Sequence, residues 1–211
     1  MLELFLKSAF IGLSIAAPVG PIGLLCIQRT LQHGMRVGLA TGLGAAVADA
    51  VYGAVGALGL AAVLAFLVDA RWWLAVGGGL FLVYLGASTA WGARRPPAGR
   101  PPAQGAGEPT AGALRAFATT FALTLSNPMT ILSFIAVFAS LASGLQGLTP
   151  VAQAVMVLAV FLGSAMWWLL LSAGVSMLRH RLPDAALAAI RLVSGVLVAA
   201  FGAWQLGSVL R

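Results

Sequence analysis

Charged residues are scarce in this sequence, and hydrophobic residues dominate it. Of its 211 residues, 8% are charged and 61% are hydrophobic, whereas soluble globular domains average about 25% and 45–50%. This composition excludes a water-soluble globule. Because a transmembrane helix uses about 20 residues, the chain has room for roughly six spans with short connections, and no room remains for a soluble catalytic domain.

Cysteine and histidine are also rare. The single cysteine, Cys26, excludes an intrachain disulfide, a Cys-x-x-Cys redox pair and a cysteine-based metal cluster. His33 and His180 both lie among arginines outside the apolar runs, so a serine protease of the membrane would lack its base. No glycine-rich phosphate-binding loop with a lysine is present, so we expect no ATP-hydrolysing domain in this chain. We therefore expect a protein that is not an enzyme and that uses no metal or cofactor.

Basic residues outnumber acidic ones by 12 to 5, which gives a formal net charge of +7. On a soluble chain this excess would suggest nucleic acid as a partner. Here the connections between the apolar runs carry the basic residues. We therefore expect contact with anionic lipid headgroups and no contact with nucleic acid.

Runs without charge mark the expected spans, because a charged side chain is costly in hydrocarbon. These runs are Ser8–Gln28, Val37–Val68 with Asp49 inside it, Trp72–Ala93, Ala116–Leu178 and Leu192–Leu210. As one helix the fourth run would be roughly three bilayers long, so it must fold back. Gly144, Gly147 and Pro150 supply the turn, and Pro150 suits the first turn of a helix. The sequence predicts an all-α integral membrane protein with six transmembrane helices.

The distribution of basic residues predicts how the spans are oriented. Nine of them flank the first, third and fifth connections, and three lie on the opposite side. The nine are Arg29, Arg36, Arg94, Arg95, Arg100, Arg115, Arg179, Arg181 and Arg191, and the three are Lys7, Arg71 and Arg211. Because cytoplasmic connections carry the excess of Lys and Arg, we expect both termini on the non-cytoplasmic side.

The chain divides into two halves of three spans each. Residues 93–114 hold five of the ten prolines and cannot bury enough apolar area to fold alone, so we expect a flexible cytoplasmic linker there. Residues 1–92 and 115–211 each begin with a proline-interrupted helix, and each ends with two glycines seven residues apart, Gly79 and Gly86 or Gly195 and Gly202. Since a unit of three spans reverses direction when repeated, the halves are expected to be inverted repeats with discontinuous first and fourth helices.

Prolines interrupt the first and fourth spans near their centres. Pro18, Pro21 and Pro128 lack the N–H that would bond the carbonyl four residues earlier. The carbonyls that they would free belong to Ser14, Ala17 and Thr124. Backbone acceptors deep in the membrane favour a binding site, although a kink accommodated by neighbouring helices is the alternative.

The amides that follow each break are the second expected feature of this site. A helix that restarts inside the membrane presents N–H groups and a partial positive charge at its N-terminus, which suit a carboxylate. Gly20, Ile22 and Met129 are the expected donors. Asn127 and Thr130 could contact a polar ligand through an amide and a hydroxyl, although capping of the broken helix serves equally well.

Asp49 is the only acidic residue inside any expected span. A helix that starts at Val37 places it about 18 Å deep, where charge costs at least about 2.5 kcal/mol and function is the default hypothesis. We expect Asp49 to bind and release a proton or to pair with another coupling ion. The alternative is a packing or dimer seam in which Asp49 only hydrogen-bonds, formed by the small-residue stripe of Gly38, Gly42, Ala45, Tyr52, Gly53 and Gly56. Tyr84 and Ser164 are weaker candidates for a pocket.

These motifs together resemble the lysine exporter (LysE/RhtB) family. The resemblance rests on Ala17-Pro-Val-Gly-Pro21 followed by Arg29, Gly34, Gly38, Gly42 and Asp49, on Tyr84-Leu-Gly86, and on Ser126-Asn-Pro-Met-Thr-Ile-Leu-Ser-Phe134. It implies six helices in inverted three-helix repeats in a bacterial inner membrane. It also implies export of amino acids or similar small metabolites from the cytoplasm, in exchange for protons or another ion.

The sequence departs from the family pattern at both breaks. The first motif reads Pro-Val-Gly-Pro where members commonly show Pro-Gly-Pro, and Met129-Thr130 follows Asn127-Pro128 where members commonly show a lysine or histidine. A neutral or apolar substrate is therefore at least as consistent with the sequence as a basic one.

Our hypothesis is an alternating-access exporter whose site lies between the two interrupted spans. Freed carbonyls and Asp49 would hold an ammonium group, and the amides after the breaks would hold a carboxylate. The rival from another class is a non-transporting membrane scaffold or assembly subunit, or a homodimer, that uses the small-residue stripe as its partner surface.

Overall fold

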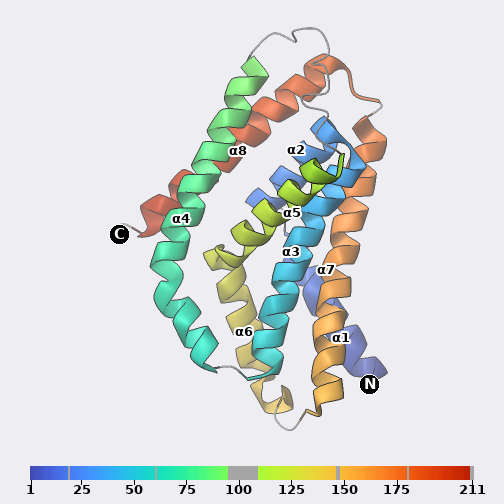
Figure 1. Ribbon diagram of the computed structural model, residues 1–211, viewed down its shortest axis with the longest axis vertical. Coiled ribbons are helices and arrows are strands. Elements are labelled where there is room, and N and C mark those ends of the chain that lie inside the picture. The colour runs from blue at the N-terminus through green and yellow to red at the C-terminus, as the bar shows by residue number, and fades with distance from the viewer. Residues whose placement is uncertain (19, 60, 95–108, 146–147, 180, 210–211) are drawn as a thin grey trace.

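The computed structural model describes residues 1–18, 20–59, 61–94, 109–145, 148–179 and 181–209. Over these ranges the chain forms helices and no strands (Figure 1). The helices are α1 (Leu2–Ala16), α2 (Pro21–His33), α3 (Met35–Ala57), α4 (Ala61–Arg94), α5 (Pro109–Leu125), α6 (Pro128–Leu145), α7 (Pro150–Arg179) and α8 (Asp184–Val209). The prediction of an all-α protein is confirmed for these ranges.

Four segments are long and apolar enough to cross a membrane on their own. They are Met35–Ala57, Asp69–Ala93, Pro150–Arg179 and Ala185–Ser208. Two bent pairs, α1 with α2 and α5 with α6, pass the same test when each pair is taken together. The chain therefore has four candidate spans, or up to six if each bent pair is one span.

The first bent pair breaks at the prolines near its centre. α1 ends at Ala16, and the Ala17 N–H donates to the Leu13 carbonyl. α2 restarts at Pro21, a position that needs no N–H in a helix. The two helix axes differ in direction by 79°. The break expected in the first span is present.

The second bent pair breaks at Asn127. α5 ends at Leu125, and α6 begins at Pro128 with its axis turned by 60°. The Asn127 side-chain oxygen accepts a hydrogen bond from the Met129 N–H at 3.1 Å. Asn127 therefore caps α6, which satisfies one of the amides that a helix start leaves without an internal partner.

Helix α3 forms the centre of the bundle, between α5 and α7 (Figure 1). Glycines allow these close approaches. A Cβ at Gly44 would collide with the Phe117 backbone of α5, and a Cβ at Gly42 would collide with the Trp168 side chain of α7. Helix α1 packs on α7 in the same way, because Gly12 faces the Val160 carbonyl.

Helices α4 and α8 lie side by side as a separate pair (Figure 1). The glycines singled out in the sequence form their contact. Gly86 lies against the Gly195 carbonyl, and Gly79 lies against the Gly202 carbonyl. The two matched glycine pairs therefore meet each other in antiparallel order, and the absence of side chains lets the two backbones touch.

The small-residue stripe of α3 is used inside the molecule. Gly38, Gly42, Gly53 and Gly56 are all buried. The Cβ that each lacks would meet a side chain of another helix: Thr30 on α2, Trp168 and Val160 on α7, and Phe138 on α6. The prediction that the stripe brings helices together is confirmed, and the surface that the scaffold and dimer readings require is covered by the chain itself.

Helix ends differ from the ends of the charge-free runs. α4 begins at Ala61 and includes the exposed Asp69 and Arg71, because an absence of charge marks what hydrocarbon tolerates and not where a helix starts. At Gly59, after α3, φ is 61°, a left-handed conformation that glycine adopts without strain. The expected turn before Pro150 includes 146 and 147, which lie outside the described residues, and α7 begins at Pro150 as expected.

The expected linker is described only at its edges. α4 continues to Arg94 and α5 starts at Pro109, so both ends of the 93–114 segment are helical. Residues 95–108 lie outside the described part of the chain.

Candidate functional site

A cavity of about 70 Å³ lies between the two helix breaks. Its walls come from both broken pairs, from α3 and from α7. The lining residues are Ile15, Ala16, Pro18, Gly20, Pro21, Ile22, Gly23, Ala45, Asp49, Thr124, Asn127, Thr130 and Trp168. We call it the central cavity.

Eight of the site candidates singled out from the sequence line the central cavity. Asp49 joins seven residues of the breaks, which are Pro18, Gly20, Pro21, Ile22, Thr124, Asn127 and Thr130. The structure thus gathers the lone intramembrane acid and both proline breaks around one space.

Four of the singled-out residues do not line this cavity. Ser14 is exposed on α1, and Ala17 is half-buried at the end of that helix. Pro128 lines a groove on the other side of the α5–α6 break. The Met129 side chain is 50% exposed, and its amide is bonded to Asn127. The Met129 N–H is therefore already satisfied by the cap.

Asp49 is held by a short hydrogen-bond chain from α7. The Ser164 hydroxyl donates to Oδ2 of Asp49 at 2.7 Å, and the Trp168 Nε1–H donates to the Ser164 hydroxyl oxygen at 3.2 Å. All three residues are buried. The chain ties the acid to the opposite wall of the cavity and fixes the direction of one of its oxygens.

The second carboxyl oxygen of Asp49 is left for a ligand. Oδ1 makes no hydrogen bond to a described residue, and Asp49 lines the cavity. No described basic side chain forms an ion pair with it, since the ion pair within the described ranges joins Lys7 to Glu3 on the exposed face of α1. A buried carboxylate needs a partner to remain charged, so a proton or a cationic group fits this position.

The start of α2 faces the same space. Gly20, Pro21, Ile22 and Gly23 all line the cavity, and no described side chain caps this helix. The first-turn amides of a helix lack internal partners and carry a partial positive charge. The two breaks therefore differ: Asn127 caps α6, whereas the amides of Ile22 and Gly23 are uncapped.

The Thr124 carbonyl, one of the expected free acceptors, already has a donor. It accepts the Asn127 N–H at 3.2 Å, and the Thr124 hydroxyl donates to the Thr120 carbonyl. A carbonyl has two lone pairs, so Thr124 can accept once more.

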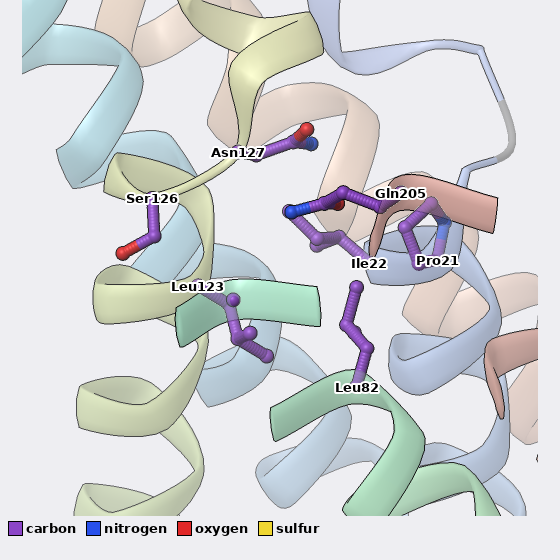
Figure 2. Close-up of a pocket in the computed structure, with 8 residues that line it drawn as sticks. Pro21, Ile22, Leu82, Leu123, Ser126, Asn127 and Gln205 are labelled. Carbon is purple, nitrogen blue, oxygen red and sulfur yellow. The ribbon is translucent and has the colours of Figure 1, made fainter. Parts of the chain in front are cut away.

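A second, smaller cavity adjoins the central one and shares Pro21, Ile22 and Asn127 with it. Its volume is about 10 Å³. Figure 2 shows Gln205 reaching from α8 toward the α5–α6 break, where Ser126 and Asn127 lie, with Leu82 and Leu123 closing the same space. We call it the side cavity.

Sequence reasoning missed several residues that face these spaces. Gln205 and Trp168 were not singled out as site residues, and Ala45 was expected only as part of the small-residue stripe of α3. Ser164 does lie beside the site through its bond to Asp49. The prediction for Tyr84 is wrong, because its side chain is 66% exposed on α4. One signal was available for Gln205: it is an uncharged polar side chain inside an apolar span, where neighbouring protein must satisfy it.

Arg29 forms a second polar cluster at the junction of α2, α3 and α5. Its guanidinium donates to the hydroxyls of Thr41, Thr119 and Thr120 and to the Ala116 carbonyl at 2.9–3.3 Å. Within the described ranges no carboxylate pairs with it. The cluster links the first broken helix to the second at a distance from the cavity lining.

The described residues hold no group of three or more His, Cys, Asp or Glu side chains placed to share a metal ion. Cys26 is buried, with its thiol against the Gly38 carbonyl and the Ser172 hydroxyl. The chemistry that the site offers is therefore that of one carboxyl group, uncapped amides and an apolar wall.

The profile of the family described as LysE type translocator matches residues 13–206, which include both breaks and Asp49. The chain belongs to this family. This LysE type translocator is 29% identical over 203 residues to a protein of Bacillus subtilis (strain 168) named amino acid efflux protein YcgF. The aligned region covers 95% of this chain and 94% of that protein. The chain is 31% identical over 168 residues to the Chemotactic transduction protein ChpE of Pseudomonas aeruginosa, over 80% of this chain and 79% of that protein.

No solved structure matches the chain at a significant level. Family membership and the apolar helices support a membrane transporter of the multi-pass, bacterial inner-membrane kind, with a small-molecule substrate. Membership of a transporter family also suggests that the protein is not an enzyme.

Proposed function

We propose that this LysE type translocator exports amino acids or similar small metabolites from the cytoplasm by proton- or ion-coupled alternating access. The observation that carries the proposal is the central cavity, which is lined by Asp49 and by residues of both helix breaks. The name of the Bacillus subtilis relative, an amino acid efflux protein, supports the substrate class.

The polar groups that line the central cavity match the two charges of an amino acid. Oδ1 of Asp49 accepts from the ammonium group, helped by the Thr124 carbonyl. The uncapped amides of Ile22 and Gly23 donate to the carboxylate at the positive end of α2. Ile15, Ile22 and Trp168 leave an apolar wall for the side chain, which favours a neutral or apolar substrate.

Coupling follows from the lack of a basic partner for Asp49. In a buried site the carboxylate is stable only with a cation beside it, so the substrate ammonium and a proton compete for the same group. In this scheme Asp49 releases its proton when the substrate binds and takes up a proton after the substrate leaves on the other side. Each transported molecule is thereby exchanged for a proton.

Alternating access requires two halves that move against each other, and several contacts support an inverted repeat. The glycine pairs of α4 and α8 meet in antiparallel order, α5 packs on α3 as α1 packs on α7, and both halves begin with a broken helix. The central cavity is well below the roughly 300–1,000 Å³ of typical ligand pockets. The breaks must therefore move apart to admit a substrate, and six spans with both termini outside fit this scheme.

The scaffold hypothesis requires the small-residue stripe of α3 to be exposed to a partner. Gly42 and Gly53 of the stripe are buried against α7, so a partner protein cannot reach them without unfolding the bundle. We therefore retain transport as the function.

The test is counterflow in proteoliposomes. Liposomes that contain the purified wild-type protein are loaded with one unlabelled amino acid at a time. They should accumulate the labelled form of one group of amino acids from outside. An outward proton-motive force should change the rate of this accumulation. Asp49→Asn should remove this dependence on the proton gradient. Ser14→Ala, which alters an exposed side chain on α1, is the matched control. Wild-type rates equal to those of empty liposomes for every amino acid and related metabolite tested would contradict the proposal.

A further inference from the structure

Gln205 is an amide buried inside an apolar helix. It is 3% exposed in α8, whose membrane-spanning part has a mean hydropathy of 2.0. Its Nε2 donates to the Ala75 carbonyl of α4 at 2.8 Å. Its Oε1 makes no hydrogen bond to any described residue, and the residue lines the side cavity. Every fully buried side-chain nitrogen and oxygen of the described residues has a partner, so this oxygen is open to the side cavity that the residue lines.

A second buried glutamine provides the comparison. Gln28 in α2 is 5% exposed, and its Nε2 donates to the Thr89 hydroxyl of α4 at 2.8 Å. Both glutamines thus hold α4 against a neighbouring helix. Gln28 lines neither the central nor the side cavity, so attachment of α4 alone does not account for the position of Gln205.

The side cavity adjoins the central cavity, and the Gln205–Ala75 hydrogen bond links it to a groove. It shares Pro21, Ile22 and Asn127 with the central cavity. Ala75, which accepts the Gln205 hydrogen bond, lines this groove of about 380 Å³ between α4, α6 and α8. Arg71, Trp72 and Ser208 also line that groove, at the end of the bundle that the charge distribution assigns to the outside.

The side cavity is much narrower than the central cavity and the groove. At about 10 Å³ it has room for one water molecule at most. Leu82 and Leu123 narrow it from α4 and α5, and Gln205 is the polar side chain from α8 that reaches into it (Figure 2). Gly78 of α4 also lines this space, and a Cβ there would lie 3.4 Å from Nε2 of Gln205, at ordinary van der Waals distance.

We propose that the transport path leaves the central cavity past Gln205, and that the Gln205 amide binds the ammonium and carboxylate groups of the substrate as they cross the side cavity into the groove. The inference rests on the proposed function, since it assigns one arm of the path to that site. An amide offers an acceptor and donors at one position, so it replaces the water that a zwitterion loses on passing Leu82 and Leu123. In the closed arrangement its donor rests on Ala75.

The first test asks whether water reaches Gln205, and it needs no transport. With Cys26 replaced by alanine, Gln205→Cys is treated with a small cationic methanethiosulfonate in liposomes. Val198→Cys is the matched control, because Val198 lies seven residues earlier on α8, is 1% exposed and belongs to an apolar cluster. We expect Gln205→Cys to react at least about 10-fold faster, since a thiol buried in apolar surroundings is inert. Equal, slow labelling of both would overturn the path.

The second test separates passage from packing. Gln205→Leu should lower counterflow of the wild-type substrate on the order of 10-fold through loss of one substrate hydrogen bond, and Gln205→Asn should restore part of it. Gln28→Leu, which removes a comparable link to α4, should keep wild-type counterflow when corrected for folded protein. Equal rates for Gln205→Leu and the wild type would overturn the role of the amide. If Gln205→Cys labels while the wild type carries no amino acid, the path stands and the proposed substrate class falls.

Discussion

The carboxyl group of Asp49 accepts a hydrogen bond from a residue 115 positions further along the chain. Ser164 occupies its Oδ2 and is itself positioned by Trp168. Glycine at position 42 makes this possible, since any larger residue there would push α7 and its tryptophan away from α3. The geometry of the acid therefore depends on a residue that contacts no ligand.

Gly42→Ala should destabilise the protein and disturb the cavity. A Cβ at this position collides with the Trp168 side chain, and overpacking of this kind costs about 1–3 kcal/mol in free energy of unfolding. Thermal unfolding of the purified protein in detergent measures the loss. Gly174→Ala on α7 is the control, because nothing lies within 4 Å of its missing Cβ and alanine favours a helix by roughly 1 kcal/mol. A Gly42→Ala variant as stable as Gly174→Ala would show that α3 and α7 do not depend on this contact.

At the residue scale the sequence located the acid but not its surroundings. Asp49 stands out because charge inside an apolar run is costly. Gln205 is a polar side chain inside an apolar span, but its place beside a cavity is not predictable, and Trp168 gives no signal at all. Which face of a helix meets a cavity depends on how distant helices pack. The same limit explains the failure for Tyr84, which is polar enough to suggest a pocket and lies on an outer face.

At the scale of single elements, the two helix breaks carry the site. Both were predictable, because proline removes the hydrogen bond that a continuous helix needs. Their different chemistry was not. Asn127 turns back to cap α6, whereas α2 starts without a side-chain cap, and only three-dimensional contacts reveal which amides are left over. Of the expected acceptors and donors, the Thr124 carbonyl and the Met129 amide each have a partner already.

Tyr52 holds the second break in place. Its hydroxyl donates to the carbonyl of Leu125, the last residue of α5, at 2.7 Å. Tyr52→Phe should therefore reduce the free energy of unfolding by about 1 kcal/mol, because the carbonyl at the helix end loses its donor. Chemical unfolding in detergent gives the difference. Tyr84→Phe is the natural control, since that ring is exposed. Equal losses in the two variants would show that the Tyr52 hydroxyl does not brace the break.

At the scale of the whole molecule, the distribution of charge predicts orientation. Nine basic residues flank one set of connections and three lie on the other side. The positive-inside rule therefore predicts that both termini face away from the cytoplasm. A C-terminal alkaline phosphatase fusion should therefore be active in cells, whereas a C-terminal green fluorescent protein fusion should be dark. The reverse pattern would place the groove beside Arg71 on the cytoplasmic side and reverse the direction assigned to the path.

Part of the architecture was predictable from the sequence. The charge-free runs predicted six spans, and the structure has four candidate spans, or up to six if each bent pair is one span. The equal glycine spacing in the two halves predicted residues that face each other across α4 and α8. The ends of the helices were harder to predict from the sequence. Helices α4 and α5 continue through charged and proline-containing segments that lie outside the charge-free runs. Spacing along a chain predicts which residues are equivalent more readily than which residues touch.

The most direct measurement of the central claim is protection of the cavity by its substrate. Thr130 lines the central cavity, so Thr130→Cys, with Cys26 replaced by alanine, should react with a small thiol reagent in liposomes. The amino acid that gives wild-type counterflow should slow this reaction in proportion to its occupancy. Labelling of Ala111→Cys, at an exposed position near the start of α5, should not change. If saturating substrate leaves the Thr130→Cys rate unaltered, the substrate does not bind between the two helix breaks.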